Sequence, residues 1–433
     1  MSVKSSFERI RADLAQIPVI DCHKHAEGPA YAKEYEDGLA AVIGGYIQSD
    51  LRSASSDREI EAICDGSKSL KDRWPLFERV WKRTEHTGYA RVTKWVMREI
   101  YGEPVMSLDA LERIDQKIID LSDDSVYWGV LDRANIRCRI VNIWGEPKSV
   151  LDGSYQFPGC DRLVIPLPLY HAAITSYGNV MDIGSQIDRK PITLDEYVDV
   201  CREIFSLYKR RGAIGMKDQS AYSRTLRFDN VAKYDAERLF NSMMDDPRTT
   251  LGWPHSKPLD DYLFHSFMRI ARDLELPVQI HTGHMAGARN DIAKTNTVRL
   301  TNTLEMHRDV QFDLFHANWP NAGDFLYLGK NYPNVYLNFC WTHIIDPVYS
   351  QDVLYQAITS VPHGKIFGFG GDYGGVEYAA GHLEIARDNI GWALARHIDS
   401  GWLGSDEARA VAADWLFNNP NRFWRLGFEP VVV

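Results

Sequence analysis

The feature that most limits the fold of this chain is a series of short apolar runs, separated from one another by sequence of helical spacing. Eight runs are strand-like: residues 17–20, 139–144, 162–169, 213–217, 276–281, 310–315, 334–339 and 365–369. Repeated alternation of strand and helix implies right-handed crossovers and a parallel sheet. Eight units predict an α/β fold of the (β/α)8 type, a TIM barrel, rather than an open doubly wound sheet. No Gly-rich dinucleotide- or phosphate-binding motif follows the first run, which agrees with the barrel.

A long stretch without strand-like sequence follows the first run. Residues 27–121 show apolar positions recurring at intervals of three and four, for example over 76–81 and 92–97. We therefore expect one domain, residues 1–433, with a large helical insertion at 27–121. A lid over the catalytic end is the favoured placement, and a helical domain packed elsewhere is the alternative. Residues 222–259 are expected to form an irregular connection.

The composition limits the kinds of partner. The formal net charge is −10 and no basic stripe is present, which argues against nucleic acid and anionic membranes. Six scattered cysteines without paired spacing predict reduced thiols in a cytoplasmic protein. The sequence shows neither a secretory signal nor an apolar run long enough to span a membrane. The expected partner is a small-molecule substrate.

Two histidines stand just past the first strand-like run. His23 and His25 are separated by one residue, so an extended backbone directs both side chains to the same face. Two imidazoles that converge on one point suit a borderline-soft divalent cation such as zinc. Alone, the pair is a weak signal, because ordinary loop histidines have the same spacing.

Later strand-like runs deliver further polar residues at their carboxyl ends, where barrel enzymes place their chemistry. The fourth run gives Lys217, the fifth His281, the sixth His316 and the eighth Asp372. All are metal ligands or acid–base groups by type. Any single one could be a buried, hydrogen-bonded side chain, but their shared position at separate strand ends indicates a metal site.

These stretches resemble the amidohydrolase superfamily, and within it the aminocarboxymuconate-semialdehyde decarboxylase-like branch, amidohydrolase 2. The resembling segments are residues 20–25, 215–217, 276–283, 315–320, 369–372 and 419–424. The resemblance implies one divalent cation, with zinc expected, bound by His23, His25, His281 and Asp372. Asp372 would also act as the base, and His316 would polarise substrate or assist proton transfer. Homo-oligomers are common in such families.

Lys217 is ambiguous under this resemblance. In binuclear relatives a lysine at this strand end is carboxylated and bridges two metals, whereas in the branch named above an unmodified lysine accompanies one metal. The second arrangement is favoured, with the ammonium available to an anionic substrate group. Further candidate substrate-binding residues follow other strands: Trp144, His284, Trp319 and Tyr373. Core or rim packing is the alternative for Trp144 and Trp319, as it is for His343, and a loop histidine bonded to backbone is the alternative for His284. Arg289 could meet a carboxylate, but a solvated surface position is favoured for it.

The leading functional hypothesis is metal-dependent hydrolysis of a small polar substrate, carrying a carboxylate or amide, by a water that the cation activates. Non-oxidative decarboxylation and a uronate-isomerase-like reaction are the alternatives on the same metal site. A non-enzymatic barrel is disfavoured, because a silent relative has no chemical need for every ligand.

Overall fold

The fold is a parallel barrel with an added helical lobe. The computed structural model describes residues 3–25, 28–143 and 147–433. Its eight strands follow one another in sequence order around the sheet. They are β1 (Val19–Lys24), β2 (Ile136–Asn142), β3 (Asp161–Pro166), β4 (Gly215–Asp218), β5 (Val278–Ile280), β6 (Phe312–Leu314), β7 (Val335–Asn338) and β8 (Ile366–Phe367). Every strand predicted from the sequence is present, which confirms the (β/α)8 class.

Two backbone hydrogen bonds bring the eighth strand to the first. The N–H of Cys22 donates to the Phe369 carbonyl at 3.2 Å, and the N–H of Asp372 donates to the His23 carbonyl at 2.9 Å. The sheet is thus nearly closed. The carboxyl ends of β1 and β8 lie side by side, which brings residues far apart in the sequence into one site.

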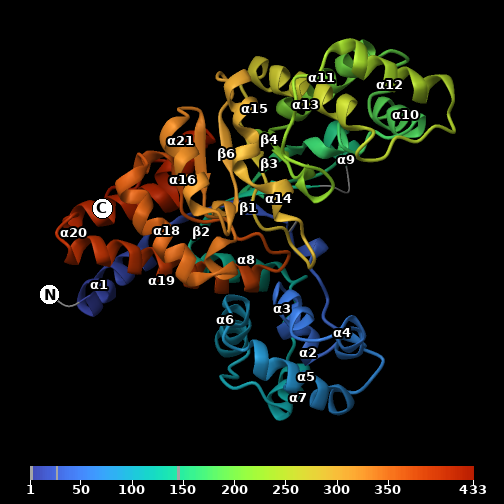
Figure 1. Ribbon diagram of the computed structural model, residues 1–433. Helices are drawn as coiled ribbons and strands as arrows, with labels where there is room; N and C mark the ends of the chain where they lie inside the picture. The colour runs from blue at the N-terminus through green and yellow to red at the C-terminus, as the bar shows by residue number, and fades with distance from the viewer. Residues whose placement is uncertain (1–2, 26–27, 144–146) are drawn as a thin grey trace.

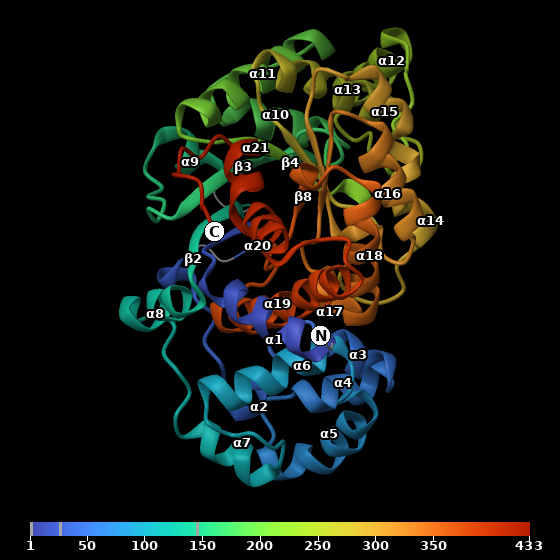
Figure 2. The same cartoon turned by 90° about the vertical axis from the view of Figure 1, so that its left-hand side faces the viewer.

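Most helices outside the insertion surround the barrel (Figures 1 and 2). These helices are α1 (Val3–Gln16), α8 (Asp124–Ala134), α9 (Pro147–Asp152), α10 (Tyr177–Ser185), α11 (Leu194–Arg210), α12 (Lys233–Asp245), α13 (Lys257–Asp273), α14 (Ile292–Thr295), α15 (Thr301–Met306), α16 (Ala322–Asn331), α17 (Thr342–Ile345), α18 (Pro347–Ser360), α19 (Val376–Asp399), α20 (Ser405–Ala413) and α21 (Asn419–Phe423). Short 3-10 turns follow β4 (η4, Ser220–Tyr222) and β6 (η6, His316–Asn318).

Local sequence explains the clearest of these helices. The side chain of Thr193 accepts from the N–H of Glu196 while the Glu196 carboxylate accepts from the Thr193 N–H, a reciprocal cap that starts α11. Val200, Ile204 and Tyr208, four residues apart, are buried on one face of that helix. An amphipathic stripe with a defined start is what a barrel-covering helix requires.

One expectation about the connections is wrong. Residues 222–259 are not irregular throughout, because they contain α12, thirteen residues long. Ala236, Phe240 and Met243 of α12 are fully buried and recur at helical spacing. Lys233, Glu237 and other polar residues surround this narrow stripe, and no side chain caps the helix start, so the sequence signal is weak.

The insertion forms a lobe apart from the barrel wall (Figure 1). Its helices are α2 (Gly38–Ile43), α3 (Ile47–Ser53), α4 (Asp57–Cys64), α5 (Leu70–Thr84), α6 (Gly88–Trp95) and α7 (Leu108–Asp115), with a π-helical turn at Val96–Ile100. No strand occurs within the described part of this segment, residues 28–121. Residue 27, the expected first residue of the insertion, lies outside the described residues.

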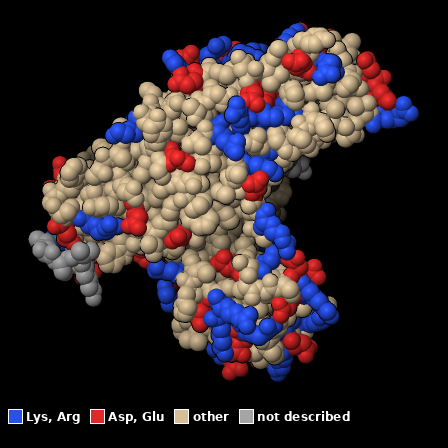
Figure 3. Space-filling view, viewed as in Figure 1, with Lys and Arg blue, Asp and Glu red and all other residues tan. Residues whose placement is uncertain are grey.

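The inner face of the lobe packs on the carboxyl end of the barrel. Phe315, Cys340 and Trp341 share one hydrophobic cluster with the insertion helices. Gly88 allows a close approach there, since a Cβ on it would lie 2.2 Å from the backbone oxygen of Ile344. On the outer face, basic and acidic side chains are intermixed (Figure 3), as in the Arg79–Glu59 and Lys82–Glu78 pairs.

The described helices include none that is long and apolar enough to cross a membrane.

Candidate metal centre

The first half of the site comes from β1. Asp21 and His23 alternate along the strand and are fully buried, while His25, just past its end, has a side chain 36% exposed. Neither ring nitrogen of His23 has a hydrogen-bond partner. A buried imidazole with no partner is costly unless a ligand satisfies it. Asp21 supports the strand end by accepting the Gly371 N–H at 2.7 Å.

Asp372 brings the other end of the chain to these histidines. Its backbone has φ of 55°, a left-handed conformation that non-glycine residues rarely adopt. The bond from its N–H to β1 holds this conformation, and its carbonyl accepts the hydroxyl of Tyr46 from the insertion. Asp372 Oδ1 then lies 2.9 Å from His25 Nε2 and 3.4 Å from His23 Nε2. One ligand atom from each of the three residues lies within 4.8 Å of the others, so together they could hold a cation.

His281 and His316 form a directional pair beside this cluster. Because a carbonyl oxygen only accepts, His316 Nδ1 must carry the proton that it donates to the Cys340 carbonyl at 2.8 Å. His316 Nε2 is then the acceptor for His281 Nδ1–H, 3.3 Å away. The lone pair of His281 is left on Nε2, which is buried and has no partner. An imidazole oriented through its second nitrogen is the usual state of a metal-ligating histidine.

The electrostatics of the site favour the neutral forms of His23 and His281. Burial, reinforced by Lys217 and neighbouring histidines, holds the pKa of His23 well below its ordinary value, and burial does the same for His281. Burial alone would raise the pKa of the Asp372 carboxyl, but the hydrogen bond and charge of His25 outweigh it, so the pKa is lowered. Neutral histidines and a carboxylate are the ligand forms that a divalent cation requires.

Lys217 lies in the barrel interior at the level of the site. It is fully buried, its Nζ has no hydrogen-bond partner, and that atom lies 3.2 Å from the centre of the Phe315 ring. Burial lowers the pKa of the Lys217 ammonium to about 8. Its register partner Gln279 instead hydrogen-bonds Asp313, a buried carboxyl whose pKa burial raises to about 7. Lys217 is therefore a buried cation that contacts the Phe315 ring and has no hydrogen-bond partner among the described residues.

A cavity of about 630 Å³ opens between the barrel and the insertion. The predicted residues His284 and Trp319 line it, together with Tyr89 from the insertion. Arg52 and Arg289, from opposite walls, also line it and both bind Asp57, at 2.8 and 3.0 Å. Asp50 lines the cavity as well, so aromatic, basic and acidic side chains meet there. The cavity approaches the histidine cluster through His284, because the Trp341 ring lies 5.2 Å from the rings of both His284 and His316.

Other predicted residues lie elsewhere. Tyr373 is buried against Tyr46 and Tyr378 and packs the insertion onto the barrel. His343 is buried and its Nε2–H donates to the Gly368 carbonyl at 2.8 Å, as a core histidine would. Trp144 lies outside the described residues.

Several residues at the site were missed in the sequence. Tyr46 bonds the Asp372 carbonyl from the insertion, Tyr222 places its ring edge 5.2 Å from the His281 ring, and Trp341 lies 5.2 Å from both His284 and His316. Cys340 lies beside His316 and Asp372. Trp341 and Cys340 follow β7, so the strand-end rule that found His281 could have found them. Tyr46 had no such signal.

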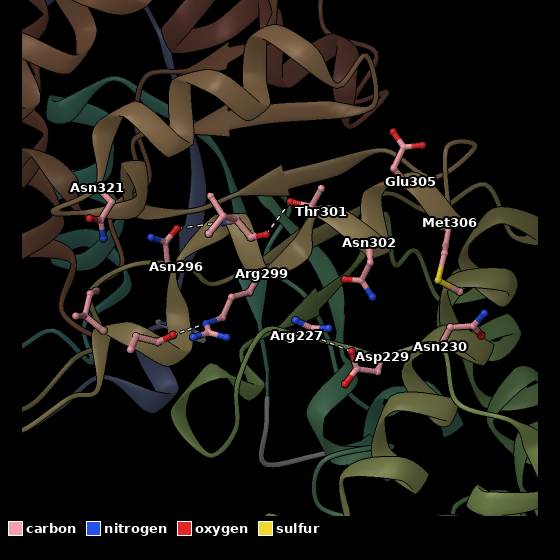
Figure 4. A pocket seen from close by; sticks show the side chains of 13 residues that line it. Arg227, Asp229, Asn230, Asn296, Arg299, Thr301, Asn302, Glu305, Met306 and Asn321 are labelled. Atoms are coloured by element: carbon pink, nitrogen blue, oxygen red, sulfur yellow. Dashed lines mark hydrogen bonds and ion pairs between the residues drawn. The ribbon is translucent and has the colours of Figure 1, made fainter.

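A larger cavity, about 940 Å³, lies away from these histidines (Figure 4). Its arginines have partners within the protein: Arg227 binds Asp229 at 2.8 Å, and Arg299 donates to the Ala293 carbonyl. Neither cavity is lined by the two residue groups able to hold a metal in the described chain, but the larger one also lacks His284, which contacts Trp341 beside His316. Size alone therefore does not make it the reactive site.

Part of the chain matches a family of known proteins. Residues 247–426 match the model of the family described as Amidohydrolase. This segment, less than half of the chain, places it in the amidohydrolase superfamily. The matched segment contains His281, His316 and Asp372, whereas the two β1 histidines precede it. The chain is also 24% identical over 230 residues to Protein fluG of Emericella nidulans, and the match spans 50% of this chain but only 26% of that relative.

Solved structures share the fold of this amidohydrolase along its whole length. A uronate isomerase from Thermotoga maritima is 12% identical with a TM-score of 0.78, and the match covers 97% of each chain. A glucuronate isomerase from Caulobacter crescentus is 16% identical with a TM-score of 0.73, over 99% of this chain and 95% of the other. A Lactobacillus casei protein described provisionally as a metal-dependent hydrolase is 16% identical with a TM-score of 0.66, over 96% and 97%. At these identities the likeness shows the fold alone.

Proposed function

We propose that this amidohydrolase is a metal-dependent hydrolase of a small polar substrate that carries a carboxylate or an amide. The observation that carries the proposal is the orientation of the buried lone pairs. His281 Nε2 and both ring nitrogens of His23 lack partners, and His23 and His25 converge on the Asp372 carboxylate. This donor set fits one divalent cation of the zinc type.

His23, His25, His281 and Asp372 would hold that cation. When bound, it would act as a Lewis acid and lower the pKa of a water in its open position. The remaining chemistry belongs to the chain. Asp372 is a carboxylate at neutral pH and can accept a proton from the attacking water. His316 Nε2, 3.7 Å from Asp372 Oδ2, can receive that proton next and return it to the leaving group.

Lys217 and the cavity support an anionic substrate. The unmodified ammonium, which has no hydrogen-bond partner among the described residues, can pair with a substrate carboxylate. That pairing offsets part of the free energy that the ammonium lost when it was removed from water. Arg52 and Arg289 line the cavity and share one carboxylate, Asp57, which each bonds through a single guanidinium nitrogen. Their remaining N–H groups can bind an anionic substrate. The insertion supplies Arg52 and Tyr89 to the cavity, so we propose that it serves as a lid.

Uronate isomerisation is the second candidate. The observation that favours it is the fold likeness to uronate isomerases over nearly the whole chain, insertion included. The two reactions differ in their demand on the site, because isomerisation moves a proton between carbons and consumes no water.

One experiment separates the candidates. Purified protein with one equivalent of zinc is assayed against a panel of N-acyl amino acids, lactones and small dicarboxylic amides, and against uronates. We expect hydrolysis that chelator abolishes and zinc restores, and that His23→Asn loses together with the metal. His86→Asn is the matched control, since its side chain is 89% exposed. Turnover of uronates alone, or hydrolysis that survives complete metal removal, would refute the proposal.

A further inference from the structure

A second set of ligand atoms lies beside the first. Cys340, two residues past β7, is fully buried. Its Sγ, a ring nitrogen of His316 and a carboxylate oxygen of Asp372 all lie within 4.8 Å of one another. Gly370 leaves the room for this arrangement, because a Cβ there would lie 2.7 Å from Cys340 Sγ. The thiol therefore occupies space in the barrel interior that the side chain of any larger residue at position 370 would need.

The two oxygens of Asp372 face different groups. Oδ1 lies near the β1 histidines, whereas Oδ2 lies 3.7 Å from His316 Nε2. Ligands about 2.1 Å from a tetrahedral cation are roughly 3.4 Å apart, so the second oxygen and the imidazole need little movement to share one ion. His316 Nε2 must then give up the hydrogen bond that it accepts from His281 Nδ1. A carboxylate with one oxygen on each side can bridge two ions that are ~3.5–4 Å apart.

We propose that His316, Cys340 and Asp372 form a second cation subsite, selective for thiophilic ions such as Zn²⁺, Cd²⁺ or Co²⁺. Entry of the ion forms a metal–sulfur bond and releases the thiol proton of Cys340 to solvent. The thiolate disfavours Mg²⁺ and Ca²⁺, which prefer oxygen ligands. The subsite differs from a lysine-bridged pair of metals, because Lys217 takes no part as a ligand.

The charges around the subsite make it the weaker of the two. The ammonium of Lys217 lies close enough to Cys340 and Asp372 to interact with both, and it opposes a second cation. The thiolate offsets part of this repulsion. The second ion should consequently bind only after the first, and excess chelator should remove it first.

Occupation of the subsite would also have a functional consequence, which rests on the proposed function. His316 Nε2 and Asp372 Oδ2 would both be bound to the ion, so neither could move the proton that hydrolysis requires. Excess zinc would then inhibit hydrolysis, whereas the first equivalent activates it.

Cobalt gives a readout that does not depend on activity. Metal-free full-length protein is titrated with Co²⁺ while the near-ultraviolet thiolate-to-cobalt charge-transfer band is recorded. We expect no band with the first equivalent and a band with the second, in the wild type and in Cys64→Ser, which removes an exposed thiol. We expect the second-equivalent band to disappear in Cys340→Ser. Absence of the band from the wild type at two equivalents would overturn the proposal whether or not the variant folds, and so would its persistence in a folded Cys340→Ser protein.

Inhibition is measured separately, as the rate with excess Zn²⁺ divided by each protein's own rate with one equivalent. A fall of tenfold or more in the wild type, absent in Cys340→Ser, supports both the subsite and the proton route. A cobalt band without zinc inhibition supports the subsite and refutes the role given to His316 and Asp372 in hydrolysis. The two proposals can therefore fail independently.

Discussion

Replacing Lys217 by Met should stabilise the metal-free protein while it removes the proposed substrate contact. The ammonium is fully buried without a hydrogen bond, and burial lowers its pKa from 10.5 to about 8. Each pKa unit corresponds to about 1.4 kcal/mol, so keeping the charge in the folded state costs roughly 3 kcal/mol. The contact with the Phe315 ring offsets ~0.5–2 kcal/mol of that cost. We therefore expect the free energy of unfolding to rise by about 1–3 kcal/mol at pH 7.

The pH dependence of the free energy of unfolding tests whether the Lys217 charge destabilises the fold. A depressed lysine pKa destabilises the fold fully below pH 8, where the folded and unfolded chains both carry the proton. The penalty decreases between pH 8 and 10.5 and is absent above that range. The stability gained in Lys217→Met should accordingly shrink to under about 1 kcal/mol at pH 10.

Urea denaturation of the wild type and variant at pH 7 and pH 10, without metal, measures both quantities. Lys365→Met is the matched control. Burial lowers the pKa of Lys365 to about 8 as well, but its Nζ donates to the carbonyls of Gly329 and Tyr332 at 2.6 and 2.7 Å. That variant should lose ~1–3 kcal/mol, because it leaves two acceptors unsatisfied. A Lys217→Met protein that is less stable than the wild type at pH 7, or a gain that is equal at both pH values, would refute the reasoning.

Four other substitutions have defined outcomes. His316→Ala should weaken zinc affinity by about 10–100-fold, because it removes the acceptor that orients His281, and His281→Ala should weaken the affinity further. Competition with a chromogenic chelator measures both affinities. A His281→Ala protein that binds zinc as tightly as the wild type would exclude His281 as a ligand. Gly88→Ala should lower the free energy of unfolding by roughly 1–3 kcal/mol, since the added Cβ would lie 2.2 Å from a backbone oxygen of the barrel. Tyr46→Phe should cost ~0.5–1.5 kcal/mol by loss of its bond to a carbonyl after β8, and an unchanged denaturation midpoint would contradict that bond.

The periodicity and the order of the apolar runs in the sequence predicted most of the fold. The apolar runs that predict strands coincide with buried strands, for example β1, β4 and β5, so local sequence and burial agree. Helix α12 was not predicted, because only one narrow stripe of its surface is buried. The placement of the insertion was likewise left open, since long-range contacts such as Gly88 against Ile344 depend on tertiary approach rather than local pattern.

The site was predictable where chemistry is tied to strand ends. His23, His281, His316 and Asp372 all lie at the barrel's carboxyl end, as the strand-end rule requires. Contacts made by the insertion, such as Tyr46, have no register relation to any strand and could not be found in this way. The proton positions on His281 and His316 also needed coordinates, because they follow from the Cys340 carbonyl that faces His316 Nδ1 and from the contact of His316 Nε2 with His281 Nδ1.

Anomalous X-ray diffraction at the zinc edge, on crystals of the protein with one equivalent of zinc, tests the metal centre most directly. We predict a single strong peak bonded to His23, His25 and Asp372, with His281 Nε2 as the remaining protein ligand. A peak that lacks Asp372 or the β1 histidines, or one located at another histidine pair such as His265 and His307, would contradict the account.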